Sequence, residues 1–336
     1  MHSFGVWRTV HPMSYSNRIF IYGPVALLIL VGVLYSVFWR VQADMLAAKL
    51  DSSNGGEVIP GVVFAFAEKS ISGYPFRLDV VLSGVTFANR GPDGETAWRT
   101  EKLAMHTMSY RSNLYVFEAA GLQSFAQPGA RGKAPRITYV TPAIARASAV
   151  LREGRLARLD LDLWQAEGKD VTPPADPKKT FSASRAQLHL LNRANDTIDI
   201  AVKIEGANLG EGYGPKLGSA IPLFDLRGKL VQSDELGDLE QGLKSLSEAV
   251  EQWRQKGGTL AVENLSLDWA GVKTDMSGTL GLDAAHRLSG VLLGKFDAAS
   301  LVGALTGGRL SLQTGNNATA MLSLRFKDGD VQLGTN

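Results

Sequence analysis

Cysteine is absent from the 336 residues of this sequence, and its absence excludes several kinds of chemistry. Without a thiol the chain cannot form a disulfide, a thiolate zinc site or an iron–sulfur cluster, and it has no cysteine nucleophile or lipidated cysteine. The sequence also lacks a Gly-x-Ser-x-Gly nucleophile elbow, a serine three residues before any lysine, and a Walker phosphate-binding pattern. The commonest signatures of exported serine enzymes and of nucleotide-binding proteins are therefore missing.

Histidine is scarce as well. Outside the first 18 residues it occurs only as His106, His189 and His286, which stand at least 83 residues apart with no second ligand at metal-site spacing. We expect each to be an isolated surface or capped histidine. The sequence thus predicts no metal, no cofactor and no catalytic residue.

Charge of one sign is missing from the first 18 residues, which hold Arg8 and Arg18 and no acidic residue. Since the whole chain has 35 basic and 33 acidic residues, 33 of each remain after this tail. Nucleic-acid-binding proteins carry a basic surface with a large positive balance. A nucleic-acid partner is therefore not expected.

The clearest feature present is an uncharged run of 21 residues from Ile19 to Trp39. At about 1.5 Å per residue it is long enough to cross a hydrocarbon core of about 30 Å. Tyr22 and Trp39 lie near its ends, where aromatic rings favour the headgroup level, and Arg18 and Arg40 close it. We interpret these four residues as the membrane anchor of a single span.

The basic tail orients this span with its N-terminus in the cytoplasm and the rest of the chain outside. A cleaved signal peptide is the alternative, with a cleavage site after Val41-Gln42-Ala43. The apolar regions of secretory signals are typically about 7 to 15 residues long, which favours the anchor. The predicted location is a bacterial inner membrane with the main domain in the periplasm.

After the span, apolar residues recur with a period of two. Leu78, Val80 and Leu82 alternate with polar neighbours, and the same pattern returns over 158–164 and 197–204. Short connections such as Arg152–Arg155 and Asn192–Asp196 leave no room for crossover helices, so neighbouring strands are antiparallel. The sequence predicts an α+β fold, mainly antiparallel β, as a curved sheet or open barrel with one long amphipathic helix, on the N-terminal transmembrane helix.

Composition divides the chain further, with a loop rich in proline and charge separating two β-rich halves. Whether these halves form one domain or two is open. The predicted order is a cytoplasmic tail (1–18), a transmembrane helix (19–39), a juxtamembrane helix and linker (40–56), a first β-rich half (57–165), the loop (166–180) and a second β-rich half (181–336).

The long amphipathic helix is predicted over 234–256, ended by Gly257-Gly258. Its apolar residues recur at spacings of three and four, which makes one narrow stripe. The stripe consists of Leu236, Leu239, Leu243, Leu246, Val250 and Trp253. We expect it either to complete the core of the sheet or to form a movable lid over an apolar groove.

Two short elements carry a family resemblance. They are Gly73-Tyr74-Pro75-Phe76-Arg77, before the first strong strand, and Ser109-Tyr110-Arg111 about thirty residues later. With the single span and the glycine-punctuated strands, they resemble an alphaproteobacterial family of uncharacterised envelope proteins, domain of unknown function 2125. The resemblance implies no activity.

The element Tyr74–Arg77 has a structural interpretation of its own. Pro75 favours an extended conformation at Tyr74, so we expect a corner at a sheet edge where the rings of Tyr74 and Phe76 are buried. Arg77 is expected to pair with a carboxylate or an aromatic ring.

These features predict a membrane-anchored, non-catalytic envelope protein. We expect its exported domain to bind an apolar or amphipathic ligand, such as lipid, in the concavity of the sheet. The alternative is a structural or assembly scaffold of the envelope that recruits a protein partner. An exported hydrolase is a more distant alternative.

Overall fold

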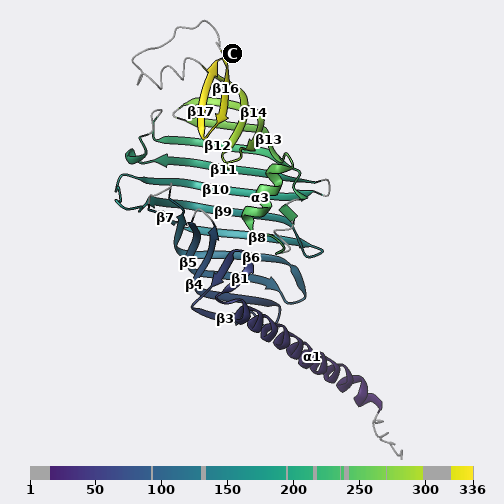
Figure 1. The fold of residues 1–336 in the computed structure, drawn as a ribbon. Helices are drawn as coiled ribbons and strands as arrows, with labels where there is room; N and C mark the ends of the chain where they lie inside the picture. The colour runs from purple at the N-terminus through teal and green to yellow at the C-terminus, as the bar shows by residue number, and fades with distance from the viewer. Residues whose placement is uncertain are drawn as a thin grey trace, which may run out of the picture.

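A computed structural model describes residues 16–91, 94–129, 134–193, 196–214, 218–234, 236–237, 242–269, 271–297 and 319–335. It contains one antiparallel sheet of 17 strands, and the long helix α1 (Ser16–Ser53) projects from one end of that sheet (Figure 1). The antiparallel, α+β fold predicted from the sequence is confirmed. The predicted tail falls mostly on residues 1–15, outside the described residues.

The strands follow one another along the chain with few other elements. Their bounds are β1 (Gly56–Ile59), β2 (Val62–Ala65), β3 (Glu68–Ser72), β4 (Arg77–Gly91), β5 (Gly94–Met108), β6 (Arg111–Gln127), β7 (Arg136–Thr141), β8 (Ile144–Arg152), β9 (Arg155–Asp170), β10 (Thr180–Arg193), β11 (Thr197–Leu209), β12 (Ala220–Val231), β13 (Thr259–Trp269), β14 (Val272–Leu282), β15 (Leu288–Asp297), β16 (Thr319–Lys327) and β17 (Asp330–Thr335). A short 3₁₀ helix η1 (Glu211–Tyr213) precedes β12, and the helix α3 (Leu246–Gln255) lies between β12 and β13.

Tight turns explain why consecutive strands pair. Arg152 pairs with Arg155 to close the β8–β9 hairpin, and Arg193 pairs with Thr197 at the β10–β11 turn. Both turns were expected from their length, since short connections join antiparallel neighbours.

The predicted loop over 166–180 is shorter than expected. β9 continues to Asp170 and β10 begins at Thr180. The two strands pair with each other from Thr180–Lys169, next to the connection, to Leu191–Arg158. The two β-rich parts therefore belong to one sheet. Residues at both ends of the predicted loop are strand residues instead, and their backbone groups are satisfied by strand pairing.

A row of residues with a left-handed backbone conformation (positive φ) bends the sheet. Gly84, Gly121 and Gly206 have φ values of +60°, +80° and +60°, and Gln165 has +46°. These residues lie at corresponding positions of β4, β6, β11 and β9, as the flanking registers show. At the same level one strand is interrupted, which divides it into β7 and β8. Both of these strands pair with β6 and with β9. Such positions bend a strand, so we call this row the crease.

The sheet folds toward its apolar face at the crease. One buried cluster joins Leu82 and Leu103, on one side of the crease, to Val85 on the other, with Phe87 and Trp98 packed against it. Leu46 and Leu50 of α1 cover the same cluster. The apolar face is therefore the concave face at this end.

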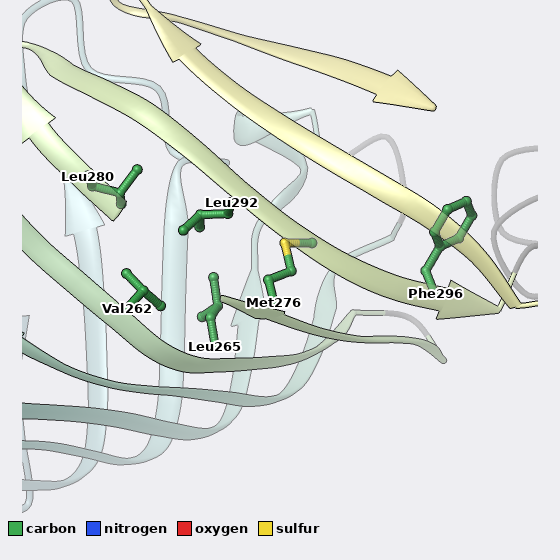
Figure 2. Packing of buried hydrophobic residues seen from close by; sticks show 6 residues of the cluster. All are labelled: Val262, Leu265, Met276, Leu280, Leu292 and Phe296. Carbon is green, nitrogen blue, oxygen red and sulfur yellow. The ribbon is translucent and has the colours of Figure 1, made fainter. Parts of the chain in front are cut away.

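A second buried cluster lies at the C-terminal end of the sheet. It contains the side chains drawn in Figure 2: Val262, Leu265, Met276, Leu280, Leu292 and Phe296. Leu292 is only 1% exposed, and burying such a side chain contributes roughly 1.5–3 kcal/mol. The two clusters stabilise the two ends of one long sheet.

The helix α1 combines two roles along its length. Residues 22–53 are long and apolar enough to cross a membrane, and the side chains from Tyr22 to Leu34 are exposed. Trp39 and Ala43 are instead buried against Leu78 of β4. The juxtamembrane helix expected after residue 39 is thus a continuation of the same helix that packs on the sheet.

The predicted helix over 234–256 is not continuous. Residues 242–245 form a turn and bend, Gly242 has a φ of +68°, and α3 begins only after Ser245. Ser245 and Glu248 form a capping box that starts a new helix. The prediction of one long helix was wrong because apolar spacing alone does not reveal an internal cap.

Candidate functional site

The concave face of the sheet is apolar across eleven strands, from β4 to β6 and from β8 to β15. Residues paired across an antiparallel ladder point to the same face, so the registers assemble continuous rows of side chains. The central row is Val80, Met105, Phe117, Ala147, Leu161, Leu188, Val202, Leu226, Leu265, Met276 and Gly294. We call this row and its two neighbours the apolar track.

The two neighbouring rows lie two residues to either side of the central row, except that a bulge in β13 separates Val262 from Leu265 by three residues. One row is Leu82, Leu103, Ala119, Ala145, Leu163, Ala186, Ile204, Phe224, Leu267, Thr274 and Phe296. The other is Leu78, Thr107, Tyr115, Ala149, Leu159, Leu190, Ile200, Gly228, Val262, Gly278 and Leu292.

The track is covered at both ends and only half-buried in its middle. The buried clusters lie at β2–β5 and β13–β15. Between them, every side chain that β9 to β12 contribute to the track is only half-buried, including Leu161, Leu188 and Val202. Exposed apolar surface is unfavourable by roughly 25 cal/mol per Å². Contiguous apolar surfaces are a common feature of binding sites.

The opposite, convex face is polar and its charges are paired across strands. Arg185 donates two hydrogen bonds to Asp162, at 2.9 and 2.8 Å, and its guanidinium lies 4.3 Å from the ring centre of Trp164. The hydrogen bond from Arg185 holds the pKa of Asp162 below its ordinary value. For Asp160, burial raises the pKa, but hydrogen bonds from Arg158 and His189 outweigh burial and lower it.

A shallow cleft of about 250 Å³ also lies on the polar face. Its charged lining includes His189, Arg227, Lys229 and Glu263. Each of these side chains already has a partner: His189 bonds Asp160, Arg227 bonds Asp225, and Lys229 bonds Glu263. These cross-strand pairs stabilise the sheet.

Helix α3 connects the two margins of the sheet, which are the two sides along which its strands begin and end. Its Trp253 donates an indole hydrogen bond of 2.8 Å to the carbonyl of Val231, at the end of β12. Its N-cap Ser245 lies beside Gly61, in the β1–β2 turn next to Asn89. By register, Val231 and Asn89 are at opposite margins of the sheet. A ten-residue helix is only about 15 Å long, so it reaches both margins because the sheet is folded at the crease.

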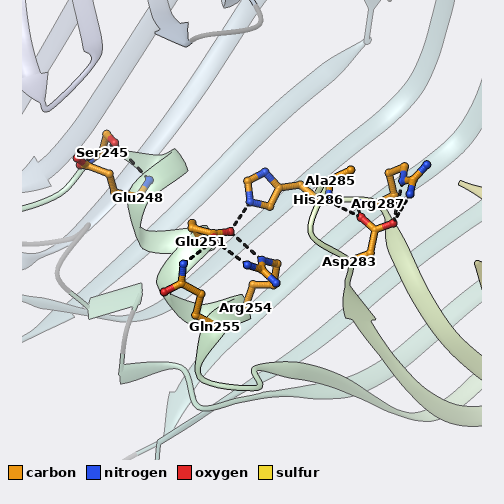
Figure 3. A network of polar contacts seen from close by, with 9 residues as sticks. All are labelled: Ser245, Glu248, Glu251, Arg254, Gln255, Asp283, Ala285, His286 and Arg287. Atoms are coloured by element: carbon orange, nitrogen blue, oxygen red, sulfur yellow. Dashed lines mark hydrogen bonds and ion pairs between the residues drawn. The ribbon is translucent and has the colours of Figure 1, made fainter. Parts of the chain in front are cut away.

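A polar network fixes α3 in place (Figure 3). Glu251 accepts hydrogen bonds from Arg254, His286 and Gln255, each at 2.6–2.7 Å. These bonds, with Arg254 contributing most, hold the pKa of Glu251 far below its ordinary range. His286 lies in the β14–β15 turn, where Asp283 binds Arg287. The network thus links α3 to the part of the sheet that forms the C-terminal cluster.

The predicted apolar stripe over 234–256 is only partly buried. Trp253 is 7% exposed, whereas Leu243 is 65% and Leu246 is 45% exposed. Leu236 and Val250 are half-buried, and Leu239 is outside the described residues. The buried side chains of α3 are Ala249 and Trp253. The stripe prediction was wrong for Leu243 and Leu246 because Leu243 lies in the bend before α3 and Leu246 is the first residue of that helix, so the helical spacing does not continue through them.

The two family-like elements form a socket for α1. Tyr35 bonds the carbonyl of Pro75 and the hydroxyl of Ser109, each at 2.8 Å. Ser36 bonds the hydroxyl of Tyr74 at 2.6 Å, and Trp39 donates to the carbonyl of Arg77 at 2.8 Å. The elements thus bind the helix that precedes them.

Within the socket, the backbone conformation depends on Gly73. Its φ is +100°, and a Cβ there would lie 2.8 Å from both the Arg77 carbonyl oxygen and Asp79 Oδ2. Arg77 pairs with Asp79 at 3.1 Å, as expected for this arginine. The turn requires glycine because any other side chain would collide with the strand that follows.

The rings of the socket are not buried, contrary to the prediction. Tyr74 is 55%, Phe76 65% and Tyr110 66% exposed. Arg111 is also exposed and bonds Asn113. The prediction assumed that aromatic rings at a sheet edge pack inward, but here the Tyr74 ring lies partly exposed against Trp39 of α1, and Phe76 and Tyr110 are mostly exposed.

The predicted membrane-anchor residues divide between two environments. Tyr22 is 66% exposed, in keeping with a ring at a membrane boundary. Arg40 is exposed and pairs with Asp44 at 3.3 Å. Trp39 is 9% exposed and packs edge-on against Tyr74, with ring centres 5.5 Å apart. Trp39 therefore anchors the helix to the domain, and the side chain of Arg18 is outside the described residues.

Each of the three histidines outside the tail is capped by a carboxylate, which is the second of the two environments predicted for them. His106 bonds Asp79, His189 bonds Asp160 and His286 bonds Glu251, each at 2.7 Å. The first two pairs join residues opposite each other in register, which sequence spacing does not show. Among the residues described, no three His, Asp or Glu side chains converge as metal ligands.

Sequence reasoning found the alternating strands but missed the track, because a row across eleven strands depends on register. The crease was also missed. Its signal was available in part, since Gly84, Gly121 and Gly206 interrupt otherwise alternating strands.

A family of known sequences matches most of the chain. A family model described as "Uncharacterized protein conserved in bacteria (DUF2125)" matches residues 39–335. No curated protein and no solved structure matches the chain. The match begins at Trp39, the first residue of α1 that is buried against the sheet.

Proposed function

The chain belongs to the DUF2125 family of bacterial proteins, and from the geometry of its sheet we propose that it is a membrane-anchored, non-catalytic protein that binds lipid acyl chains along the apolar track. The observation that carries the proposal is the half-buried middle of the track, between β9 and β12. An acyl chain lying across Leu161, Leu188 and Val202 would cover the apolar surface that no described element covers there.

The position of α1 supports lipid as the ligand. The helix covers the first cluster with Leu46 and Leu50, so the track begins where the helix leaves its exposed apolar segment. In our proposal α1 is a single inner-membrane span, with the N-terminus in the cytoplasm and the sheet in the periplasm. The basic tail supports this orientation. A protein anchored in this way holds its apolar face next to a source of lipid.

The convex face supports a non-catalytic role. Its carboxylates, such as Asp160 and Asp162, are engaged with arginine and histidine partners. Helix α3 crosses the open side of the folded sheet and would retain a bound chain beneath it. A binding site of this type needs apolar walls and few polar groups.

Photo-crosslinking tests the proposal on the full chain. The protein would be reconstituted in vesicles of phosphatidylethanolamine and phosphatidylglycerol, with p-benzoylphenylalanine at position 188 on the track. Position 187 is the matched control, because Gln187 is the adjacent residue on the convex face. Position 30 in the span is the positive control.

We expect lipid adducts at positions 30 and 188 and none at 187. Adducts at position 30 with none at 188, or equal adducts at 187 and 188, would refute lipid binding on the track. Mass spectrometry of the adducts would identify the lipid class.

The second candidate is an assembly scaffold that recruits a protein partner. It is favoured by β17, which in the described part of the sheet pairs only with β16. Exposed strand edges bind extended segments of other proteins by strand addition. A scaffold would show crosslinks to protein from positions in β17, and an unlabelled track.

A further inference from the structure

Two hairpin tips beside α1 expose aromatic rings to the surroundings. They are the β3–β4 turn, with Tyr74 and Phe76, and the β5–β6 turn, with Tyr110. We propose that these tips form a membrane-contact collar, seated in the headgroup region of the bilayer that α1 crosses. The partner is the lipid surface itself; the proposal rests on the membrane span proposed for α1 and not on lipid binding along the track.

Contacts with α1 set the depth of the tips. A bilayer core needs about 20 apolar residues of helix. Counted from Ile19, the first residue of the uncharged run, such a span ends near Phe38, just before Arg40. Tyr35 and Ser36 lie before that end, and they bond Pro75, Ser109 and Tyr74 directly. The tips must therefore sit at the level where the helix leaves the hydrocarbon.

The exposed fractions agree with that depth. Phe76 and Tyr110 are 65% and 66% exposed, and Met108 is 38% exposed. Large apolar side chains gathered at one end of a sheet are unfavourable in water. Tyrosine and other aromatic rings are favourable at the membrane–water boundary, where one part of the ring is apolar and another is hydrated.

Charge around the tips suits lipid headgroups. Arg77 and Arg111 border the two turns and their side chains are exposed. Arg40 follows Trp39 by one residue and is also exposed. The acidic groups here are Asp44, paired with Arg40, and Asp79, paired with Arg77 and His106. Arginine near a bilayer surface attracts anionic headgroups by about 1 kcal/mol each.

The collar explains why both family-like elements lie at one end of the sheet. Backbone carbonyls and the side chains of Tyr74 and Ser109 hold α1, while Phe76 and Tyr110 remain exposed. Together with α1 they attach the sheet to the membrane at several points. One helix alone would let the sheet rotate about the membrane normal and tilt, whereas a collar limits its tilt and keeps the start of the track, at Leu78, at the bilayer.

Depth measurement with spin labels tests the collar. The chain has no cysteine, so a single introduced cysteine is a unique labelling site. Full-length Phe76→Cys and Tyr110→Cys would be labelled with a nitroxide and reconstituted in vesicles of phosphatidylethanolamine and phosphatidylglycerol. Val37→Cys in α1 reports lipid, and Leu293→Cys reports water. Leu293 is 45% exposed and lies on β15, at the other end of the sheet.

At positions 76 and 110 we expect collisions with lipid-soluble oxygen to exceed those with a water-soluble nickel chelate, with depths between those of positions 37 and 293. Collision rates equal to those at position 293 would overturn the proposal. Two independent collar sites keep the test decisive if one variant does not fold. An unchanged melting temperature, expected because both side chains are exposed, would show that each label reports the native tip.

Discussion

The indole of Trp39 donates a hydrogen bond to the backbone carbonyl of Arg77 across 2.8 Å, and so joins the candidate membrane helix to the first residue of β4. The same ring is buried against Leu78 and Ala43. This single side chain couples the orientation of α1 to that of the sheet.

We predict that Trp39→Ala lowers the free energy of unfolding of the detergent-solubilised chain by about 3–5 kcal/mol, the usual cost of removing a buried tryptophan. Trp39→Phe keeps most of the packing and loses one hydrogen bond, so it should cost about 1 kcal/mol. Val37→Ala is the control, since Val37 is 57% exposed on α1. Equal melting temperatures for Trp39→Ala and Val37→Ala would show that the helix does not dock on the sheet.

The membrane topology is tested with a reporter enzyme fused after Asn336. Because the tail carries Arg8 and Arg18 and no acidic residue, we expect activity only from a reporter that works outside the cytoplasm. Sequencing the N-terminus of the mature protein is the companion measurement. A mature protein that begins at Asp44 would replace the anchor with a cleaved signal, and cleavage there would also remove Trp39.

The apolar track predicts a polarity effect at its centre. Leu188→Lys places a charge among the acyl chains proposed to lie there, whereas Gln187→Lys places it on the polar face next to Asp162. We expect the first change to reduce copurifying lipid at least tenfold, which corresponds to about 1.4 kcal/mol, and the second to leave it unchanged. Native mass spectrometry of the detergent-extracted protein measures both. Equal lipid content in the two variants would contradict binding on the track.

The ion pair between Arg185 and Asp162 predicts a dependence of stability on pH. Because the hydrogen bond from Arg185 lowers the pKa of Asp162 in the folded chain, the pair stabilises the fold above the ordinary value of 3.8, and this contribution is lost as the pH falls through the folded pKa. Asp162→Asn should therefore be less stable than the wild type at pH 6, with the difference vanishing in acid. Unfolding curves between about pH 2 and 7 measure it, and Asp330→Asn, at an exposed carboxylate, is the control. A difference that persists unchanged at low pH would assign the effect to packing.

Local patterns predicted the strands well because alternation is a property of neighbouring residues. Leu78, Val80 and Leu82 do share one face of β4, and the Arg152–Arg155 turn does close a hairpin. The antiparallel fold followed from these local signals. The apolar segment of α1 could also be predicted from the sequence, since it depends on length and composition alone.

Features that depend on strand register or on contacts between distant residues could not be predicted from the sequence. The pair His189–Asp160 joins residues 29 positions apart, and Trp39–Arg77 joins residues 38 apart. Neither leaves a spacing signal in the sequence. The track could not be predicted either, because a shift of one residue in any strand would turn its side chains to the other face.

The last prediction concerns helix α3 and the residues just before it, some of which are buried and others exposed. Trp253 is buried and bonds Val231, whereas Leu243 is 65% exposed before the helix begins. Trp253→Ala should lower the free energy of unfolding by about 3–5 kcal/mol, and Leu243→Ala by no more than about 0.5 kcal/mol. Thermal unfolding of the full chain measures both values.

Amide hydrogen exchange then separates a fixed strap from a movable lid. If α3 is held by Trp253 and the Glu251 network, its amides should exchange slowly in the delipidated protein. If α3 is a lid, they should exchange quickly without lipid and be protected when phosphatidylglycerol is added, because a ligand that binds only the closed form stabilises it by mass action. We expect slow exchange at Ala249 and Trp253 in both states, since both side chains are buried without any ligand. Fast exchange at these two residues in the delipidated chain would show that α3 opens and would support the lid.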